Sequence, residues 1–97
     1  MVKNFFSDKV ILITGASSGL GKTFANFFIK KSAKVIVCSR RNTFRGQFYR
    51  TNKNFHFFKF DLNEINKIKL FIKKLSKKFR KIDILINNAG VAIPKKF

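Results

Sequence analysis

Residues 14–21 of the chain read TGASSGLG and join a short apolar run, VILI at residues 10–13, to an amphipathic segment. Glycines at such a junction let the backbone turn tightly and approach an anion closely. The following residues carry apolar side chains at helical spacing, so a helix is expected to begin within the turn. The free N–H groups at a helix N-terminus attract phosphate. The stretch therefore predicts a strand, a phosphate-binding turn and a helix.

Outward from this turn, apolar runs alternate with amphipathic segments. Runs at 35–38, 55–60 and 82–86 predict three further strands, and segments 20–31 and 65–79 predict helices. Strands that alternate with helices form right-handed crossovers and a parallel sheet. We expect one partial dinucleotide-binding domain over residues 1–97, in the element order β-α-β-β-α-β. Its fold class is α/β, a Rossmann-like parallel sheet with strand order 3-2-1-4, flanking helices and no second half.

Three details of this layout follow from the residues. The segment 39–54 is polar and rich in arginine, and it holds either a short helix or a loop. Asn63 is the expected N-cap of the second long helix, with Glu64 favourable in its first turn. The open edge of the fourth strand leaves Ile84 and Ile86, and the Phe-rich face of the last helix, exposed to solvent.

The composition excludes several classes of protein. The chain has 22 Lys and Arg residues against 4 Asp and Glu residues, too few carboxylates for a calcium cage. A single cysteine, Cys38, and a single histidine, His56, exclude a disulfide framework and a Cys/His zinc site, and we expect no metal. No apolar run is long enough for a transmembrane helix or a secretory signal. We expect a cytoplasmic, reducing compartment, with membrane association left open.

The net charge of +18 raises the alternative of a basic interaction module that binds acidic partners. The lysines are scattered along the chain, and the abundant Phe, Ile, Lys and Asn all have A/T-rich codons. We therefore interpret the charge mainly as a composition bias and expect no specific nucleic-acid partner.

A second alternative overlaps the glycine-rich turn. Gly21-Lys22-Thr23 closes a Walker-A-like loop if Ala16 replaces its first glycine, which would make the chain a P-loop NTPase. Such a protein also needs an apolar strand that ends in a metal-binding Asp. The best candidate, FFKFD at residues 57–61, is interrupted by Lys59.

Three motifs at successive strand ends resemble the short-chain dehydrogenase/reductase family. They are the Thr-Gly-x-x-x-Gly-x-Gly turn, Asp61-Leu62 after the third strand and the Asn87-Asn88-Ala89-Gly90 segment after the fourth. The resemblance extends from Asp8 to about Pro94. Residues 81–91, KIDILINNAGV, are similar to the retinol-dehydrogenase-type members. A P-loop NTPase has no reason to carry the last motif.

The resemblance implies a role for each matching residue. Those of the turn would hold the pyrophosphate and the nearby ribose: Gly15, Ser17, Ser18, Gly19, Leu20 and Gly21. Asp61 and Leu62 would border the adenine. Asn88, Ala89 and Gly90 would line the ribose side, and Asn87 would tie the central strands together. These residues make the chain, by resemblance, part of an oxidoreductase that acts on a carbonyl or alcohol substrate.

The end of the second strand indicates which dinucleotide binds. An acidic residue about 20 positions after the glycines selects NAD, but this chain has Cys38-Ser39-Arg40-Arg41 there. Arg40 can fork onto a 2′-phosphate, with Ser39 donating a hydroxyl and Arg41 adding charge. The predicted cofactor is NADP(H).

The family's catalytic Ser and Tyr-x-x-x-Lys pair have no counterpart here. Tyr49 and Lys53 have the spacing, but they lie between the second and third strands, so we interpret the match as coincidence. We expect no catalytic residues in this chain, weak cofactor binding and no turnover by the chain alone. A non-enzymatic remnant stays open as an alternative.

Overall fold

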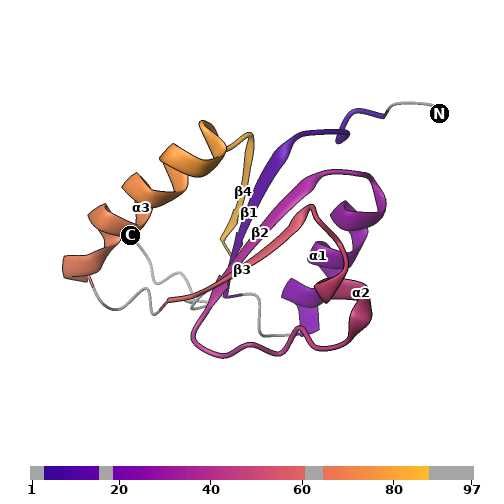
Figure 1. The fold of residues 1–97 in the computed structure, drawn as a ribbon, viewed down its shortest axis with the longest axis horizontal. Coiled ribbons are helices and arrows are strands. Elements are labelled where there is room, and N and C mark those ends of the chain that lie inside the picture. Colours follow the sequence, from indigo (N-terminus) through magenta and orange to yellow (C-terminus); the bar gives the residue numbers. More distant parts are fainter. Residues whose placement is uncertain (1–3, 16–18, 61–64, 88–97) are drawn as a thin grey trace, which may run out of the picture.

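The computed structural model describes residues 4–15, 19–60 and 65–87. Within them the elements alternate as β1 (Val10–Thr14), α1 (Gly19–Lys30), β2 (Lys34–Ser39), α2 (Gln47–Arg50), β3 (Phe55–Lys59), α3 (Ile65–Phe79) and β4 (Ile84–Asn87) (Figure 1). The predicted strands and long helices are present. The polar segment after β2 holds a helix, α2, of one turn.

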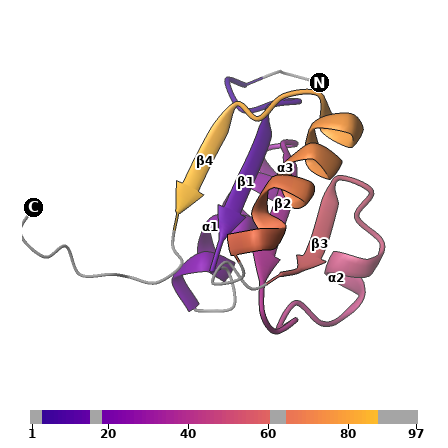
Figure 2. The same cartoon turned by 90° about the vertical axis from the view of Figure 1, so that its left-hand side faces the viewer.

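All described strands are parallel and lie in the order β3-β2-β1-β4 (Figure 2). The predicted Rossmann-like sheet is thereby confirmed. Its register pairs Thr14 with Cys38 on one side and with Asn87 on the other. The carboxyl ends of β1, β2 and β4 therefore finish at one level, where a parallel α/β sheet binds its ligands.

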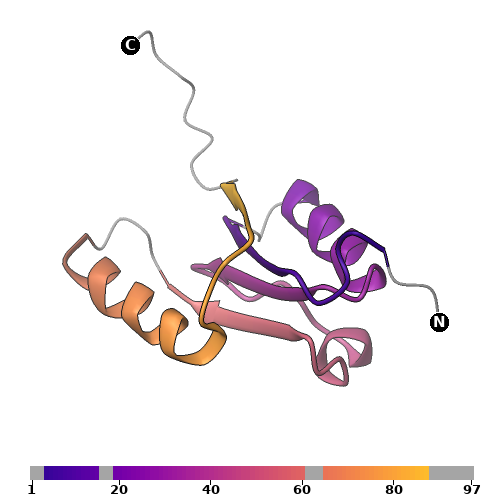
Figure 3. The same cartoon turned by 90° about the horizontal axis from the view of Figure 1, so that it is seen from above.

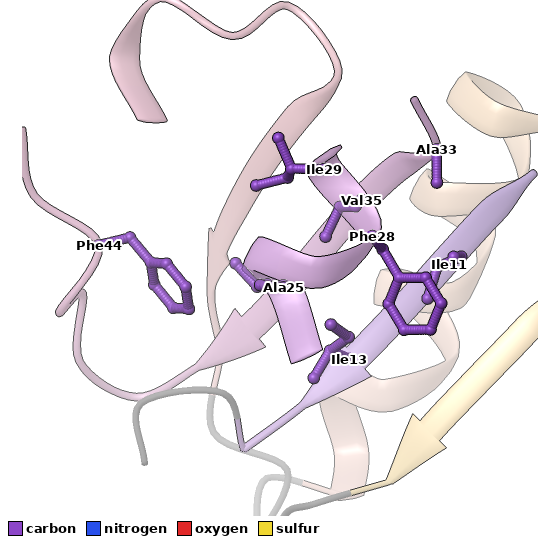
Figure 4. Packing of buried hydrophobic residues seen from close by; sticks show 9 residues of the cluster. Ile11, Ile13, Ala25, Phe28, Ile29, Ala33, Val35 and Phe44 are labelled. Atoms are coloured by element: carbon purple, nitrogen blue, oxygen red, sulfur yellow. The ribbon is translucent and has the colours of Figure 1, made fainter. Parts of the chain in front are cut away.

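The helices lie on both faces of the sheet, α1 and α2 on one and α3 on the other (Figure 3). On the α1 face, Phe28 and Ile29 of α1 pack over the sheet, and Phe44 joins them from the loop after β2 (Figure 4). The buried members of this cluster are Ile11, Ile13, Ala25, Phe28, Ile29, Ala33, Val35, Val37 and Phe44. Since strand residues alternate between faces, each strand contributes every second residue to it.

The α3 face has a smaller core. Leu75 packs with Val10 and Ile36, and rings of Phe71 and Phe79 cover the β3 side of the same cluster. The predicted exposure of the Phe-rich face of α3 is therefore wrong, because these rings lie against the sheet. Among the apolar residues of α3 whose side chains are described, Leu70 and Ile72 are exposed.

The prediction for β4 was also wrong in its side chains. Ile84 and Ile86 are half-buried and pack against the α1-side cluster. Leu85, which points the other way, is 60% exposed. The strand starts at Ile84, after Asp83 has paired with β1: the Asp83 N–H donates to the Val10 carbonyl at 2.8 Å, and the Val10 N–H donates to the Asp83 carboxylate at 2.8 Å.

Two further expectations concern parts of the chain outside β-strands. No described helix is long and apolar enough to cross a membrane. The predicted cap, Asn63, and its neighbour Glu64 lie outside the described residues.

Candidate functional site

The glycine-rich turn leaves β1 through a left-handed residue. Gly15 has a φ of 63°, a conformation that glycine adopts without steric cost. Its N–H donates to the Cys38 carbonyl of β2 at 2.9 Å, which fixes the start of the turn against the sheet. Ser17 and Ser18 lie outside the described residues, and the chain enters α1 at Gly19.

The first turn of α1 has space beside it. A Cβ added to Gly19 would meet no atom within 4 Å. Leu20 is exposed, whereas Gly21 is buried. No acidic residue stands in this first turn, so no carboxylate competes for the positive end of the helix. An anion can approach the backbone here without displacing a side chain of a described residue.

The end of β2 carries two exposed cations. The Ser39 hydroxyl is buried and donates to the Arg41 carbonyl at 2.6 Å, so it closes the turn. To donate to a phosphate as predicted, the Ser39 hydroxyl would have to give up its hydrogen bond to the Arg41 carbonyl. Arg40 and Arg41 follow as exposed residues, and no acidic residue occurs between Asp8 and Asp61. The charge at this edge suits an anionic group.

The ends of β1 and β4 are joined by side chains. The Thr14 hydroxyl donates to the Asn87 side-chain oxygen at 2.8 Å. This bond is consistent with the expected role of Asn87 in tying the central strands together. The other predicted site residues of this edge lie outside the described residues: Asp61, Leu62, Asn88, Ala89 and Gly90.

The two residues of the Walker-like alternative are engaged elsewhere. The Lys22 ammonium donates to the Thr43 carbonyl at 2.9 Å, in the loop after β2. The Thr23 hydroxyl donates back to the Gly19 carbonyl at 3.0 Å. Lys22 thus contacts the protein rather than the open space beside Gly19, and sequence reasoning missed this contact because no spacing rule links residues 22 and 43.

The Tyr-x-x-x-Lys match has a structural explanation. The Tyr49 hydroxyl donates to the side-chain oxygen of Asn26 on α1 at 2.7 Å. Its ring packs edge-on against Phe44 and beside Phe55. Tyr49 therefore anchors α2 to α1, which agrees with the interpretation of the match as coincidence.

Cys38 and His56 have shifted pKa values. Burial raises the pKa of the Cys38 thiol to about 11, which keeps it protonated and unreactive. Burial, together with the charges of Lys78 and Lys34, lowers the pKa of His56. No group of His, Cys, Asp and Glu that could hold a metal ion occurs in the described parts of the chain.

Three comparisons place this geometry among known proteins. The family model of short chain dehydrogenases matches residues 9–97. The Dehydrogenase/reductase SDR family protein 7-like of Drosophila melanogaster is 33% identical over an alignment of 102 positions, which covers 94% of this chain and 30% of that protein. The NADP-dependent 3-hydroxy acid dehydrogenase of Schizosaccharomyces pombe is 41% identical over an alignment of 92 positions, which covers 88% of this chain and 35% of that protein.

A solved structure is similar over the whole chain. The short chain dehydrogenase of Leptospira borgpetersenii with bound NAD⁺ has a TM-score of 0.81 and 29% identity, covering all of this chain and 38% of that one. The chain thus spans about a third of the length of these relatives. The Schizosaccharomyces pombe relative is named for NADP, whereas the Leptospira borgpetersenii structure holds NAD⁺. The choice of dinucleotide in this chain therefore has to be argued from its own residues.

Proposed function

Because this chain belongs to the short-chain dehydrogenase family, we propose that it is the NADP(H)-binding N-terminal portion of an oxidoreductase. The complete protein would transfer hydride between the nicotinamide, which supplies that chemistry when bound, and a carbonyl or alcohol substrate. The turn after β1 and the first turn of α1 would hold the pyrophosphate, where the space beside Gly19 and the absence of acidic residues support close approach of the backbone.

The observation that carries the choice of NADP(H) is the pair of exposed cations after β2. Arg40 and Arg41 extend from a turn fixed by the Ser39 hydroxyl. A guanidinium binds a 2′-phosphate in two parallel hydrogen bonds, whereas the 2′-hydroxyl of NAD(H) offers it no charge. No carboxylate occurs between β2 and β3 to repel that phosphate. NADPH is therefore the expected ligand.

The proposal extends to what the chain lacks. Residues 1–97 supply cofactor-binding groups and no catalytic residues: the tyrosine with the right spacing, Tyr49, is held by Asn26 and by aromatic rings. The chain by itself would bind cofactor weakly and would not turn over substrate. The retinol-dehydrogenase-like subtype rests on residues 81–91 alone and stays a prediction.

The test of cofactor choice is a fluorescence titration of the 97-residue chain with NADPH and with NADH. We expect NADPH to bind more tightly and Arg40→Asp to reverse the preference, since the carboxylate repels the 2′-phosphate and accepts from a 2′-hydroxyl. Arg45→Asp, with the same charge change at an exposed position of the same loop, is the control and should keep the preference. An unchanged preference in Arg40→Asp would overturn the assignment of Arg40.

The phosphate turn has its own test. Gly19→Val should abolish binding of both cofactors, because the side chain would occupy the space beside the helix terminus. Its thermal unfolding should change little, since an added Cβ meets no described atom. Retained binding would show that the phosphates bind elsewhere.

The net charge of +18 supports one competing function, a basic module that binds acidic partners. Such a module would bind duplex DNA with a steep dependence on salt concentration and would not distinguish the two cofactors. The same titrations, repeated with a DNA duplex at two salt concentrations, separate it from the proposed oxidoreductase.

A further inference from the structure

Lys22 connects two parts of the molecule that lie far apart in sequence. Its ammonium group donates to the Thr43 carbonyl at 2.9 Å, and it lies 5.7 Å from the centroid of the Phe44 ring. Lys22 stands in the first turns of α1, next to the phosphate turn. Thr43 and Phe44 belong to the loop that carries Arg40 and Arg41. The Lys22 side chain thus links α1, whose first turn would bind the pyrophosphate, to the loop whose arginines would bind the 2′-phosphate.

The Phe44 end of this link is rigidly held. Phe44 is 4% exposed and is part of the core beneath α1, as Figure 4 shows. Its ring packs edge-on against Tyr49 and beside Phe55. Its N–H donates to the Asn42 side chain at 2.8 Å. Thr43 therefore sits at the margin of a packed aromatic cluster and gives Lys22 a fixed point of attachment.

The other end of the loop is fixed as well. Ser39 is buried at the last position of β2, and its hydroxyl donates to the Arg41 carbonyl at 2.6 Å. Between Ser39 and Thr43 the residues 40–42 are exposed. The two arginines are thus carried on a short segment held at both ends. At the Thr43 end, the Lys22 bond adds to the packing of Phe44, and as a charge-assisted bond it is stronger than a neutral one.

We propose that Lys22 is a positioning residue for cofactor specificity, which holds the Arg40–Arg41 segment where a 2′-phosphate binds. This inference rests on the proposed function, because it needs the two arginines to face that phosphate. It assigns Lys22 a contact with the protein and none with the pyrophosphate. Removal of the ammonium would then release the loop, lower the affinity for NADPH and leave NADH unaffected.

The experiment compares Lys22→Met with Lys30→Met in the 97-residue chain. Lys30 lies in the last turn of the same helix and is exposed, so its substitution removes the same charge without touching the loop. Hydrogen–deuterium exchange of the segment 40–46 is measured without cofactor. Dissociation constants are measured for NADPH and for NADH.

We expect Lys22→Met to speed exchange in the segment 40–46 and to weaken NADPH binding about tenfold, the loss of one charge-assisted bond. Binding of NADH should change less than about twofold. Lys30→Met should match the wild type in both readouts. Lys22→Arg should restore the preference for NADPH, because a guanidinium also donates to a carbonyl.

The following results would each contradict the inference, at a different step. Unchanged exchange in Lys22→Met would show that the bond does not hold the loop. An equal loss of NADPH and NADH binding would assign Lys22 to the shared part of the cofactor. If Lys22→Met does not fold, Lys22→Arg decides, and its failure to keep the preference refutes the positioning role. A wild-type chain that does not prefer NADPH would refute the proposed function itself, while the exchange data would still report on the bond.

Discussion

The face of the sheet that α1 covers is closed to solvent along β1 and β2, whereas the face that α3 covers is open along β4. Ile11, Ile13, Val35 and Val37 point toward α1 and are fully buried. On the α3 side Leu75 fills the space above Val10 and Ile36, but Leu85 stays 60% exposed. The alternation of side chains along β4 separates its half-buried isoleucines from this leucine. Burial of an apolar strand residue here depends on whether a helix crosses above it.

The position of α3 explains the difference. Its rings pack on β3, where Phe71 meets Phe58 and Phe79 meets His56. On the same face, β4 receives little cover from the described residues: Leu85 of β4 is 60% exposed, and Ile72 of α3 is 57% exposed. Within the described residues, α3 thus covers β2, β3 and part of β1 and leaves Leu85 of β4 exposed.

The largest loss of stability is expected for a substitution in the core on the α1 face. Phe28→Ala should lower the free energy of unfolding by about 3–4 kcal/mol, because a buried ring leaves a cavity among close-packed neighbours. That is a large share of the ~5–15 kcal/mol that stabilises a domain. Urea unfolding followed by circular dichroism measures it. Phe27→Ala, the neighbouring and half-exposed ring, is the control and should cost about 1 kcal/mol. Equal losses would contradict the sealed core.

A smaller effect is expected on the α3 face. Leu75 is 2% exposed, so Leu75→Ala should cost about 2–3 kcal/mol in the same urea measurement. Leu70, on the same helix, is 70% exposed, and Leu70→Ala should change stability by less than about 0.5 kcal/mol. Comparable losses for the two variants would mean that α3 presents a different side to the sheet.

Much of this layout was predictable from the sequence because local pattern determines it. The apolar runs gave the strands, and the spacing of Leu75 and its neighbours gave α3. The parallel sheet followed from the alternation of strands and helices, and the strand order 3-2-1-4 was that of the dinucleotide-binding fold. The turn after β1 was predictable because the positive φ at position 15 is a conformation that glycine adopts without steric cost.

The features that the sequence analysis did not predict depend on contacts between residues that no local pattern relates. The exposure of Leu85 depends on which part of its face α3 covers, and the partial burial of Ile84 depends on the packing of the α1-side cluster. Periodicity carries no information on either. The contact between Lys22 and Thr43 joins residues 21 positions apart, so no helical or strand spacing indicates it. The hydroxyl of Ser39 was expected to face a ligand, but a nearby carbonyl competes for it.

A pH effect is expected on the α3 face alone. His56 lies on β3 with its ring edge-on to Phe79, and burial together with Lys78 and Lys34 lowers its pKa below the ordinary 6.5. The folded state then binds fewer protons than the unfolded state, so stability is full above pH 6.5 and falls as the pH drops through the lowered pKa. The free energy of unfolding should decrease from pH 7.5 to about pH 5.

The control for this effect is His56→Phe, which keeps a ring against Phe79 and cannot titrate. Its stability should be nearly constant over the same pH range. A decrease as large as that of the wild type would assign the titration to another group and remove the difference in pH response between the two faces.

The smallest effect on stability is expected at Leu85, and its contrast with Ile84 bears most directly on the open half of the α3 face. Leu85→Thr keeps a good strand former at an exposed position, so the free energy of unfolding should change by less than about 0.5 kcal/mol. Ile84→Thr, one residue away, places a hydroxyl against the α1-side cluster and should cost about 1–2 kcal/mol. Because β4 is an edge strand of the described sheet and exposes this leucine, Leu85→Thr should also reduce self-association in sedimentation measurements at raised concentration. Equal destabilisation by the two variants would mean that Leu85 is covered, and unchanged self-association would mean that copies of the chain meet through another surface.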